Sequence, residues 1–145
     1  MKNLEIYIHI PFCVRKCEYC DFLSFPADDG AKLRYVNGLM AEMIFYGPLM
    51  KNYQVSSVYI GGGTPSSIDE QWIAALMEGV FDCFNVLPDA EISIECNPGT
   101  LSREKLLAYR DAGINRLSIG LQSANNDELK LLGRIHTFEQ FVTNY

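Results

Sequence analysis

The segment Leu4-Glu-Ile-Tyr-Ile-His-Ile10 decides the fold class, because apolar and polar residues alternate along it without a break. A two-residue period places successive side chains on opposite faces of a β-strand. The aliphatic residues share one face: Leu4, Ile6, Ile8 and Ile10. The opposite face carries Glu5, Tyr7 and His9. The segment therefore predicts a strand with one apolar and one polar face.

Residues 55–60, 91–95 and 116–119 show the same alternation. Their apolar faces comprise Val58, Ile60, Ile92, Ile94, Leu117 and Ile119. Their polar faces comprise Ser57, Tyr59, Glu91, Ser93, Glu95, Arg116 and Ser118. Parallel strands covered on both sides normally read as continuous apolar runs. If helices cover the apolar face, the polar face looks into a polar interior, as in a barrel lumen that holds a polar ligand.

Helical periodicity fills the intervals between these strands. The first predicted helix carries Leu33, Val36, Met40, Met43 and Ile44, and the second carries Trp72, Leu76, Val80 and Phe84. Ser67 with Glu70 predicts a capping box, Ser102 predicts the start of a third helix ending at Gly113, and Thr137 with Gln140 predicts another box. The order β-α-β-α-β-α-β-α predicts an α/β fold with a parallel sheet and right-handed crossovers. An antiparallel sheet with a solvated face is the alternative, which the long helical connections disfavour.

Composition limits the classes of function. The chain has 145 residues, 48% of them hydrophobic, and a net charge of −6. This is enough apolar chain for one core, and the acidic balance disfavours nucleic acid or an anionic membrane as a partner. The longest nearly apolar stretch, residues 38–50, is too short to span a membrane, and polar residues and a proline interrupt the N-terminal apolar run. We therefore expect a cytoplasmic protein with reduced cysteines.

Unusual residues follow all four predicted strands. The motif Cys13-x-x-x-Cys17-x-x-Cys20 follows the first strand, and Gly61-Gly-Gly-Thr-Pro65 follows the second. Residues 95–99, Glu-Cys-Asn-Pro-Gly, end the third strand, and residues 120–122, Gly-Leu-Gln, end the fourth. The carboxyl ends of parallel strands are the edge where α/β proteins build their sites. We expect these four segments to form one site.

Three thiols within eight residues indicate a soft metal or an iron–sulfur cluster. Zinc needs a fourth ligand, which His9 or Cys96 could supply. A 4Fe–4S cluster with three cysteine ligands instead leaves one iron open for another ligand. The spacing leaves both readings open.

Each remaining candidate site residue has both a structural and a functional explanation. The three glycines suggest close approach of the backbone to a ligand, or a tight turn, and they match neither a dinucleotide fingerprint nor a P-loop. Taken alone, Glu95 and Arg134 are more typical of solvated side chains than of site residues. Cys83 is expected in packing, Cys96 in packing or at the site, and His136 at a helix end, while His9 suits a site or a core role.

Taken together, these motifs resemble the radical S-adenosylmethionine (SAM) superfamily. The strings Tyr7-Ile-His-Ile-Pro-Phe-Cys13, Asn115-Arg-Leu-Ser-Ile-Gly-Leu-Gln-Ser123 and Leu132-Gly-Arg-Ile-His-Thr137 are similar to its coproporphyrinogen III oxidase-like branch. The resemblance covers nearly the whole chain. It implies a partial TIM-type radical SAM barrel, of which residues 1–145 would supply the first four β-α units of a (β/α)6 core, without the C-terminal domain.

The resemblance also implies a set of site residues. Cys13, Cys17 and Cys20 would ligate a 4Fe–4S cluster whose open iron is chelated by SAM. The residues expected near SAM are Tyr7, Tyr19, Gly62, Gly63, Thr64, Glu95, Gln122 and Arg134. The chemistry expected of the complete protein is reductive cleavage of SAM to a radical that abstracts hydrogen, with flavodoxin or ferredoxin as a possible electron donor.

One departure distinguishes two types within the branch. The oxidase is expected to show CxxxCxxCxC, and here the last position is Phe22. This resembles the HemW type, implying a chaperone that binds and delivers heme; oxidative decarboxylation of coproporphyrinogen III is the alternative, and whether the protein is an enzyme stays open. The family's heme-binding segment would lie beyond residue 145, so no heme ligand is assigned. Residues 1–145 alone are expected to be marginally soluble and inactive.

Overall fold

The computed structural model describes residues 1–15 and 17–145, so Lys16 lies outside it. Four strands, β1 (Lys2–Ile10), β2 (Tyr53–Gly62), β3 (Val86–Cys96) and β4 (Arg116–Ile119), form one sheet in the order β1-β2-β3-β4. Every neighbouring pair is parallel. The predicted parallel sheet is therefore confirmed, and the first three strands extend beyond their predicted bounds.

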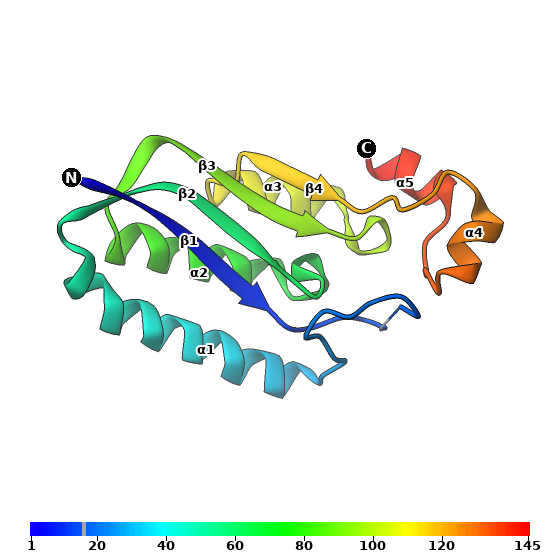
Figure 1. Ribbon diagram of the computed structural model, residues 1–145, viewed down its shortest axis with the longest axis horizontal. Helices are drawn as coiled ribbons and strands as arrows, with labels where there is room; N and C mark the ends of the chain where they lie inside the picture. Colours follow the sequence, from blue (N-terminus) through cyan, green and yellow to red (C-terminus); the bar gives the residue numbers. More distant parts are fainter. Residues whose placement is uncertain (16) are drawn as a thin grey trace.

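Three helices cover one side of this sheet (Figure 1). They are α1 (Asp29–Tyr46), α2 (Glu70–Cys83) and α3 (Arg103–Asp111). Two short helices, α4 (Asn126–Leu131) and α5 (Phe138–Asn144), lie beyond the carboxyl ends of the strands. Short 3-10 helices occupy residues 47–50, 65–67 and 98–100. No helix in residues 1–15 and 17–145 is both long and apolar enough to cross a membrane.

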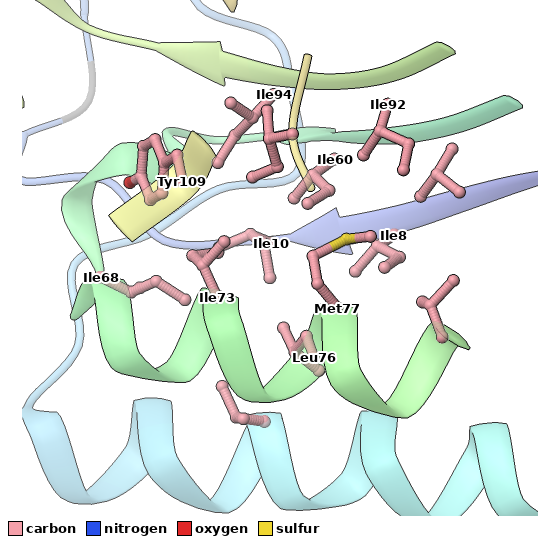
Figure 2. Close-up of a cluster of buried hydrophobic side chains, with 14 of the residues drawn as sticks. Ile8, Ile10, Ile60, Ile68, Ile73, Leu76, Met77, Ile92, Ile94 and Tyr109 are labelled. Carbon is pink, nitrogen blue, oxygen red and sulfur yellow. The ribbon is translucent and has the colours of Figure 1, made fainter. Parts of the chain in front are cut away.

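The core lies between the apolar face of the sheet and these helices. Figure 2 shows the isoleucines of β1, β2 and β3 facing α2. Ile10, Ile60 and Ile94 from the strands and Ile73 and Leu76 from α2 have no exposed surface. Burial of each such side chain stabilises the fold by about 1.5–3 kcal/mol. The alternation of apolar residues therefore fixes which side of the sheet the helices cover.

The register aligns the polar residues in rows on the opposite face. Tyr7 pairs with Tyr59, Tyr59 with Ser93, and Ser93 with Arg116. The rings of Tyr7 and Tyr59 stack, with centroids 6.2 Å apart. In the following rows His9 pairs with Gly61, and Glu95 pairs with Ser118. The predicted polar face is confirmed, and α1, α2 and α3 all lie on the other side of it.

Several helix details differ from expectation. Asp69, rather than Ser67, caps α2, because Pro65 begins a 3-10 turn that delays the helix to Glu70. The Ser67 hydroxyl instead donates to the Phe12 carbonyl at 3.4 Å. On α1, Leu33 and Ile44 are exposed, so they lie outside the buried stripe of Val36 and Met43.

Other predicted helix boundaries hold. Ser102 caps α3, and Thr137 with Gln140 forms the capping box of α5. Gly113 follows the end of α3 with a φ of +89°, a conformation that ends helices and favours glycine. Phe84 follows α2 as its C-cap and packs against the core.

Candidate functional site

A cavity of about 290 Å³ lies at the carboxyl ends of the strands. All the predicted site residues except Tyr7 are in its described lining: Cys13, Cys17, Cys20, Tyr19, Gly62, Gly63, Thr64, Glu95, Gln122 and Arg134. These residues come from segments that are up to 121 positions apart in sequence, because parallel strands deliver their following loops to the same edge. The expectation that the four strand ends form one site is confirmed as a spatial arrangement.

The loop between β1 and α1 carries Cys13, Cys17 and Cys20 and is called the cysteine loop below. Backbone hydrogen bonds fix its start. The amide of Gly63 donates to the Ile10 carbonyl at 2.9 Å, and the amide of Thr64 donates to the Phe12 carbonyl at 2.7 Å. The Cys13 amide donates to the Phe25 carbonyl at 3.2 Å, which closes the base of the loop. As a result, the Cys13 thiol lies 3.5 Å from the Thr64 hydroxyl.

The three glycines at positions 61–63 leave room for neighbouring side chains and for the backbone of the cysteine loop. A Cβ on Gly62 would lie 2.8 Å from the His9 ring, and the φ of +119° at this residue favours glycine. A Cβ on Gly63 would lie 2.7 Å from the Phe12 carbonyl oxygen and 3.0 Å from the Cys13 sulfur. Close approach does explain the glycines, but the groups that approach them are the neighbouring strand and the cysteine loop.

The Glu95 carboxylate is held by two donors. The Tyr59 hydroxyl donates to its Oε1 at 2.8 Å, and the Gly62 amide donates to its Oε2 at 3.0 Å. Burial raises the pKa of Tyr59 above its ordinary value, and the hydrogen bond to Glu95 raises it further. Tyr59 therefore remains a protonated donor at neutral pH. Glu95 is thus a fixed acceptor in the cavity wall rather than a solvated strand-end acid.

Arg134 lies between α4 and α5 and connects this part of the chain to the cysteine loop. One guanidinium nitrogen donates to the Cys17 sulfur at 3.7 Å and to the Tyr19 hydroxyl at 3.2 Å, and the other donates to the Gly120 carbonyl at 3.2 Å. Its Nε is buried and has no partner among the described residues. Arg134 is therefore not the solvated arginine that its sequence position alone suggests.

Tyr7 lies on the polar face of the sheet, but the described cavity lining does not include it. Its hydroxyl is 3.0 Å from His9 Nδ1, and His9 Nε2 is 3.2 Å from the Leu23 carbonyl oxygen of the cysteine loop. Tyr7 is therefore bonded to His9, whose ring lies next to Gly62 of the cavity wall, and His9 has a hydrogen-bonded role between the sheet and the loop.

Three residues in the cavity lining were not expected at the site: Arg15, Phe22 and Ser118. Ser118 is on the predicted polar face of β4, and Arg15 and Phe22 lie among or next to the three cysteines, which was the available signal. His136, expected at a helix end, is 3% exposed and lies 3.1 Å from the Leu121 carbonyl oxygen through Nε2. It is a buried residue because the segment before α5 folds against the loop that follows β4.

The other two cysteines differ from the motif. Cys96 belongs to the core and also lines the cavity, and burial raises the pKa of its thiol to about 12. Cys83 is partly buried against the core at the end of α2, as predicted. All five cysteines have free thiols. Within residues 1–15 and 17–145, no group of three or more His, Cys, Asp or Glu side chains has the geometry to hold a single metal ion.

Comparison with known proteins places this arrangement in a family. Residues 7–145 match the family described as the Radical SAM superfamily. The chain is 42% identical over 139 residues to the heme chaperone HemW of Escherichia coli, covering 92% of this chain and 35% of that protein. It is 37% identical over 140 residues to the heme chaperone HemW of Bacillus subtilis, covering 96% of this chain and 37% of that protein. It thus spans about a third of the length of these relatives.

Two further relatives extend the comparison. A mitochondrial radical S-adenosyl methionine domain-containing protein of Bos taurus is 40% identical over 138 residues, covering 94% of this chain and 31% of that protein. The solved structure of coproporphyrinogen III oxidase HemN from Escherichia coli, described as a radical SAM enzyme, superposes with a TM-score of 0.89 at 32% identity. The superposition covers 98% of this chain and 33% of that chain. The α/β fold with four parallel strands therefore matches part of a radical SAM barrel of the TIM type.

Proposed function

This chain belongs to the radical SAM superfamily, and we propose that it forms the N-terminal part of a radical SAM core domain in a heme chaperone of the HemW type. The relatives named heme chaperones support the assignment to the HemW type. The observation that supports the radical SAM core domain is the shared cavity, which gathers the three thiols of the cysteine motif, the Glu95 carboxylate and the Arg134 guanidinium from distant parts of the chain.

The cysteine motif suits a 4Fe–4S cluster. Thiolates are the usual ligands of such clusters, and the thiols of Cys13, Cys17 and Cys20 line one cavity and are free. The Arg134 guanidinium donates to the Cys17 sulfur at 3.7 Å, so a positively charged group faces this proposed ligand. The three cysteines would hold the cluster, and the Thr64 hydroxyl beside Cys13 would donate a hydrogen bond toward its sulfur.

The rest of the cavity suits SAM. Glu95 offers a fixed carboxylate to a cationic or hydroxyl group, and Arg134 offers a buried Nε–H without a partner among the described residues to an acidic group. Gly62, Gly63, Thr64, Gln122 and Tyr19 would complete the pocket, with Tyr7 contributing through His9. When both cofactors are bound, they supply a low-potential electron and a sulfonium that this electron can cleave. The chain itself contributes orientation and exclusion of water.

Heme delivery is favoured over porphyrinogen oxidation by position 22. The oxidase pattern expects a cysteine there, whereas this chain has Phe22, which lines the cavity. Oxygen-independent oxidation of coproporphyrinogen III is the second candidate, and the close match to the HemN structure favours it. In either case a flavodoxin or ferredoxin would supply the electron, and the tetrapyrrole would be heme or a porphyrinogen.

The cofactor proposal is tested by anaerobic reconstitution of the full-length protein with iron and sulfide. Wild type should bind about four irons and develop the broad visible absorption of a 4Fe–4S cluster. Cys17→Ala should lose both signals, whereas Cys83→Ala, a thiol outside the cavity, should retain them. Zinc in place of iron, or an intact cluster in Cys17→Ala, would refute the ligand assignment.

The functional proposal is tested on the same reconstituted protein. A heme chaperone should bind heme stoichiometrically, transfer it to an acceptor hemoprotein, and leave coproporphyrinogen III unchanged under reducing conditions. Conversion of coproporphyrinogen III to protoporphyrinogen IX with release of 5′-deoxyadenosine would establish the second candidate instead.

A further inference from the structure

Tyr59 lies beside the site, although the sequence placed it only on the polar face of the sheet and not among the site residues. It is on the polar face of β2, half-buried, and its ring stacks on Tyr7 with an interplanar angle of 21°. Its hydroxyl donates to Glu95 Oε1 at 2.8 Å. The described lining of the cavity includes Glu95 and does not include Tyr59. Tyr59 therefore acts on the cavity through the carboxylate.

The two donors to Glu95 hold its oxygens separately. Tyr59 holds Oε1, and the Gly62 amide holds Oε2 at 3.0 Å. A carboxylate accepts at about four lone-pair positions, so each oxygen keeps acceptor capacity after these two bonds. Because one donor is backbone and the other is a stacked ring, the carboxylate plane has little freedom to rotate.

Gly61 provides the space for this arrangement. A Cβ at position 61 would lie 2.8 Å from Tyr59 Cε1 and 3.0 Å from Glu95 Oε2. The first distance requires the Tyr59 ring to shift, and the second requires the Glu95 carboxylate to give by a few tenths of an ångström. The absence of a side chain at Gly61 thus leaves space for the Tyr59–Glu95 pair. Gly62 and Gly63 leave space for His9 and Cys13 in the same way.

We infer that Tyr59 is a positioning residue that fixes the Glu95 carboxylate for binding of SAM, an inference that rests on the proposed SAM site. Removal of the hydroxyl leaves Glu95 with the Gly62 amide alone and free to rotate away from the cavity. Partners of this kind, which orient a binding group without touching the ligand, change affinity by about 10-fold or more in metal sites. We expect a similar factor here.

The test uses the full-length protein reconstituted with iron and sulfide, with SAM itself as the probe. Tyr59→Phe keeps the ring and removes the hydroxyl, and it should raise the Kd for SAM about 10-fold by calorimetric titration while iron content and thermal midpoint stay at wild-type values. Tyr109→Phe is the matched control, because its hydroxyl is buried in the core without a partner among the described residues. The control should leave the Kd unchanged.

A double-mutant cycle separates positioning from a general structural effect. If Tyr59 acts through the carboxylate, Tyr59→Phe should change the Kd less than twofold in a Glu95→Gln background. Gly61→Ala provides a second route, since its Cβ displaces both members of the pair, and it should also weaken SAM binding about 10-fold or more.

The outcomes distinguish this inference from the proposed function. If Glu95→Gln weakens SAM binding but Tyr59→Phe does not, or if Tyr59→Phe has the same effect in both backgrounds, the positioning role is overturned while the SAM site stands. If the cluster-loaded wild type binds no SAM, or Glu95→Gln binds it as wild type does, the proposed SAM site fails and the inference fails with it.

Discussion

Replacement of Gly63 by alanine tests how tightly the glycine loop holds the cysteine loop. The new Cβ would lie 2.7 Å from the Phe12 carbonyl oxygen and 3.0 Å from the Cys13 sulfur. Neither side can move freely, because Gly63 donates to Ile10 and Thr64 donates to Phe12 through the backbone. The substitution must therefore either displace Cys13 or stretch one of these hydrogen bonds.

The expected cost follows from these two effects. Overpacking of a well-packed site costs about 1–3 kcal/mol, and a lost backbone hydrogen bond costs about 1 kcal/mol. Gly63→Ala should therefore lower the free energy of unfolding of the apoprotein by about 2–4 kcal/mol. Because the Cys13 sulfur is one of the crowded atoms, the iron bound on reconstitution should also fall.

Urea denaturation followed by circular dichroism measures the first effect, and iron analysis measures the second. Gly38→Ala is the matched control, since Gly38 lies within α1 and its added Cβ would meet nothing within 4 Å. It should stabilise the protein by about 0.5–1 kcal/mol through helix propensity, with no change in bound iron. Wild-type stability and iron content in Gly63→Ala would refute the close-packed loop described above.

Three further predictions concern the helix cap, a thiol and a histidine. Asp69→Ala should cost about 1 kcal/mol of unfolding free energy and Ser67→Ala less than half of that, because Asp69 caps α2; the reverse order, measured by urea denaturation, would restore the Ser67 cap. In the apoprotein at pH 8, iodoacetamide should modify Cys13 well before Cys96, whose pKa burial raises to about 12; equal rates by mass spectrometry would contradict this. Burial lowers the pKa of His136 below its ordinary value of 6.5, so the unfolded chain takes up a proton before the folded one as pH falls. Unfolding free energy should then decrease below pH 6.5, by at most about 1.4 kcal/mol per pH unit, and less steeply in His136→Gln; equal slopes would exclude the effect.

Most of the fold was predictable because its signal is local. Strict alternation fixed both faces of the sheet, and the register later aligned the polar residues as expected. The largest difference is the start of β3, predicted at residue 91 but observed at Val86. Pro88 lies where the β2–β3 register is interrupted, between the pairs Val55–Val86 and Ser57–Glu91. A proline is tolerated at such an irregularity, although in sequence it reads as a strand breaker.

The helix details were less predictable because competing local signals look alike. Ser67 and Asp69 both suit an N-cap, and only the 3-10 turn that begins at Pro65 selects Asp69. Leu33 and Ile44 fit a spacing of three and four as well as Val36 and Met43 do. Which of these residues meet the sheet depends on how α1 packs, and this is a tertiary property.

The site also has residues that could be predicted from the sequence and residues that could not. Strand-end positions and motif resemblance identified the residues that line the cavity, since topology brings strand ends together. They did not identify Tyr59, because its contact with Glu95 crosses from β2 to β3 and depends on the register. They placed His136 correctly just before the Thr137 cap of α5 but did not reveal its burial, because the folding of residues 132–137 back over the loop after β4 leaves no periodic signal.

The order of strands along the sheet has a consequence for biosynthesis. Each strand pairs with the one made just before it, so the sheet can grow by one β-α unit at a time as the chain leaves the ribosome. The anchors of the cysteine loop directly after β2, Gly63 and Thr64, follow about fifty residues after Cys13, whereas Arg134 follows Cys17 after 117 residues. A nascent chain therefore carries three tethered but incompletely enclosed thiols until Arg134 has emerged, and loading of the proposed iron–sulfur cluster belongs after that point.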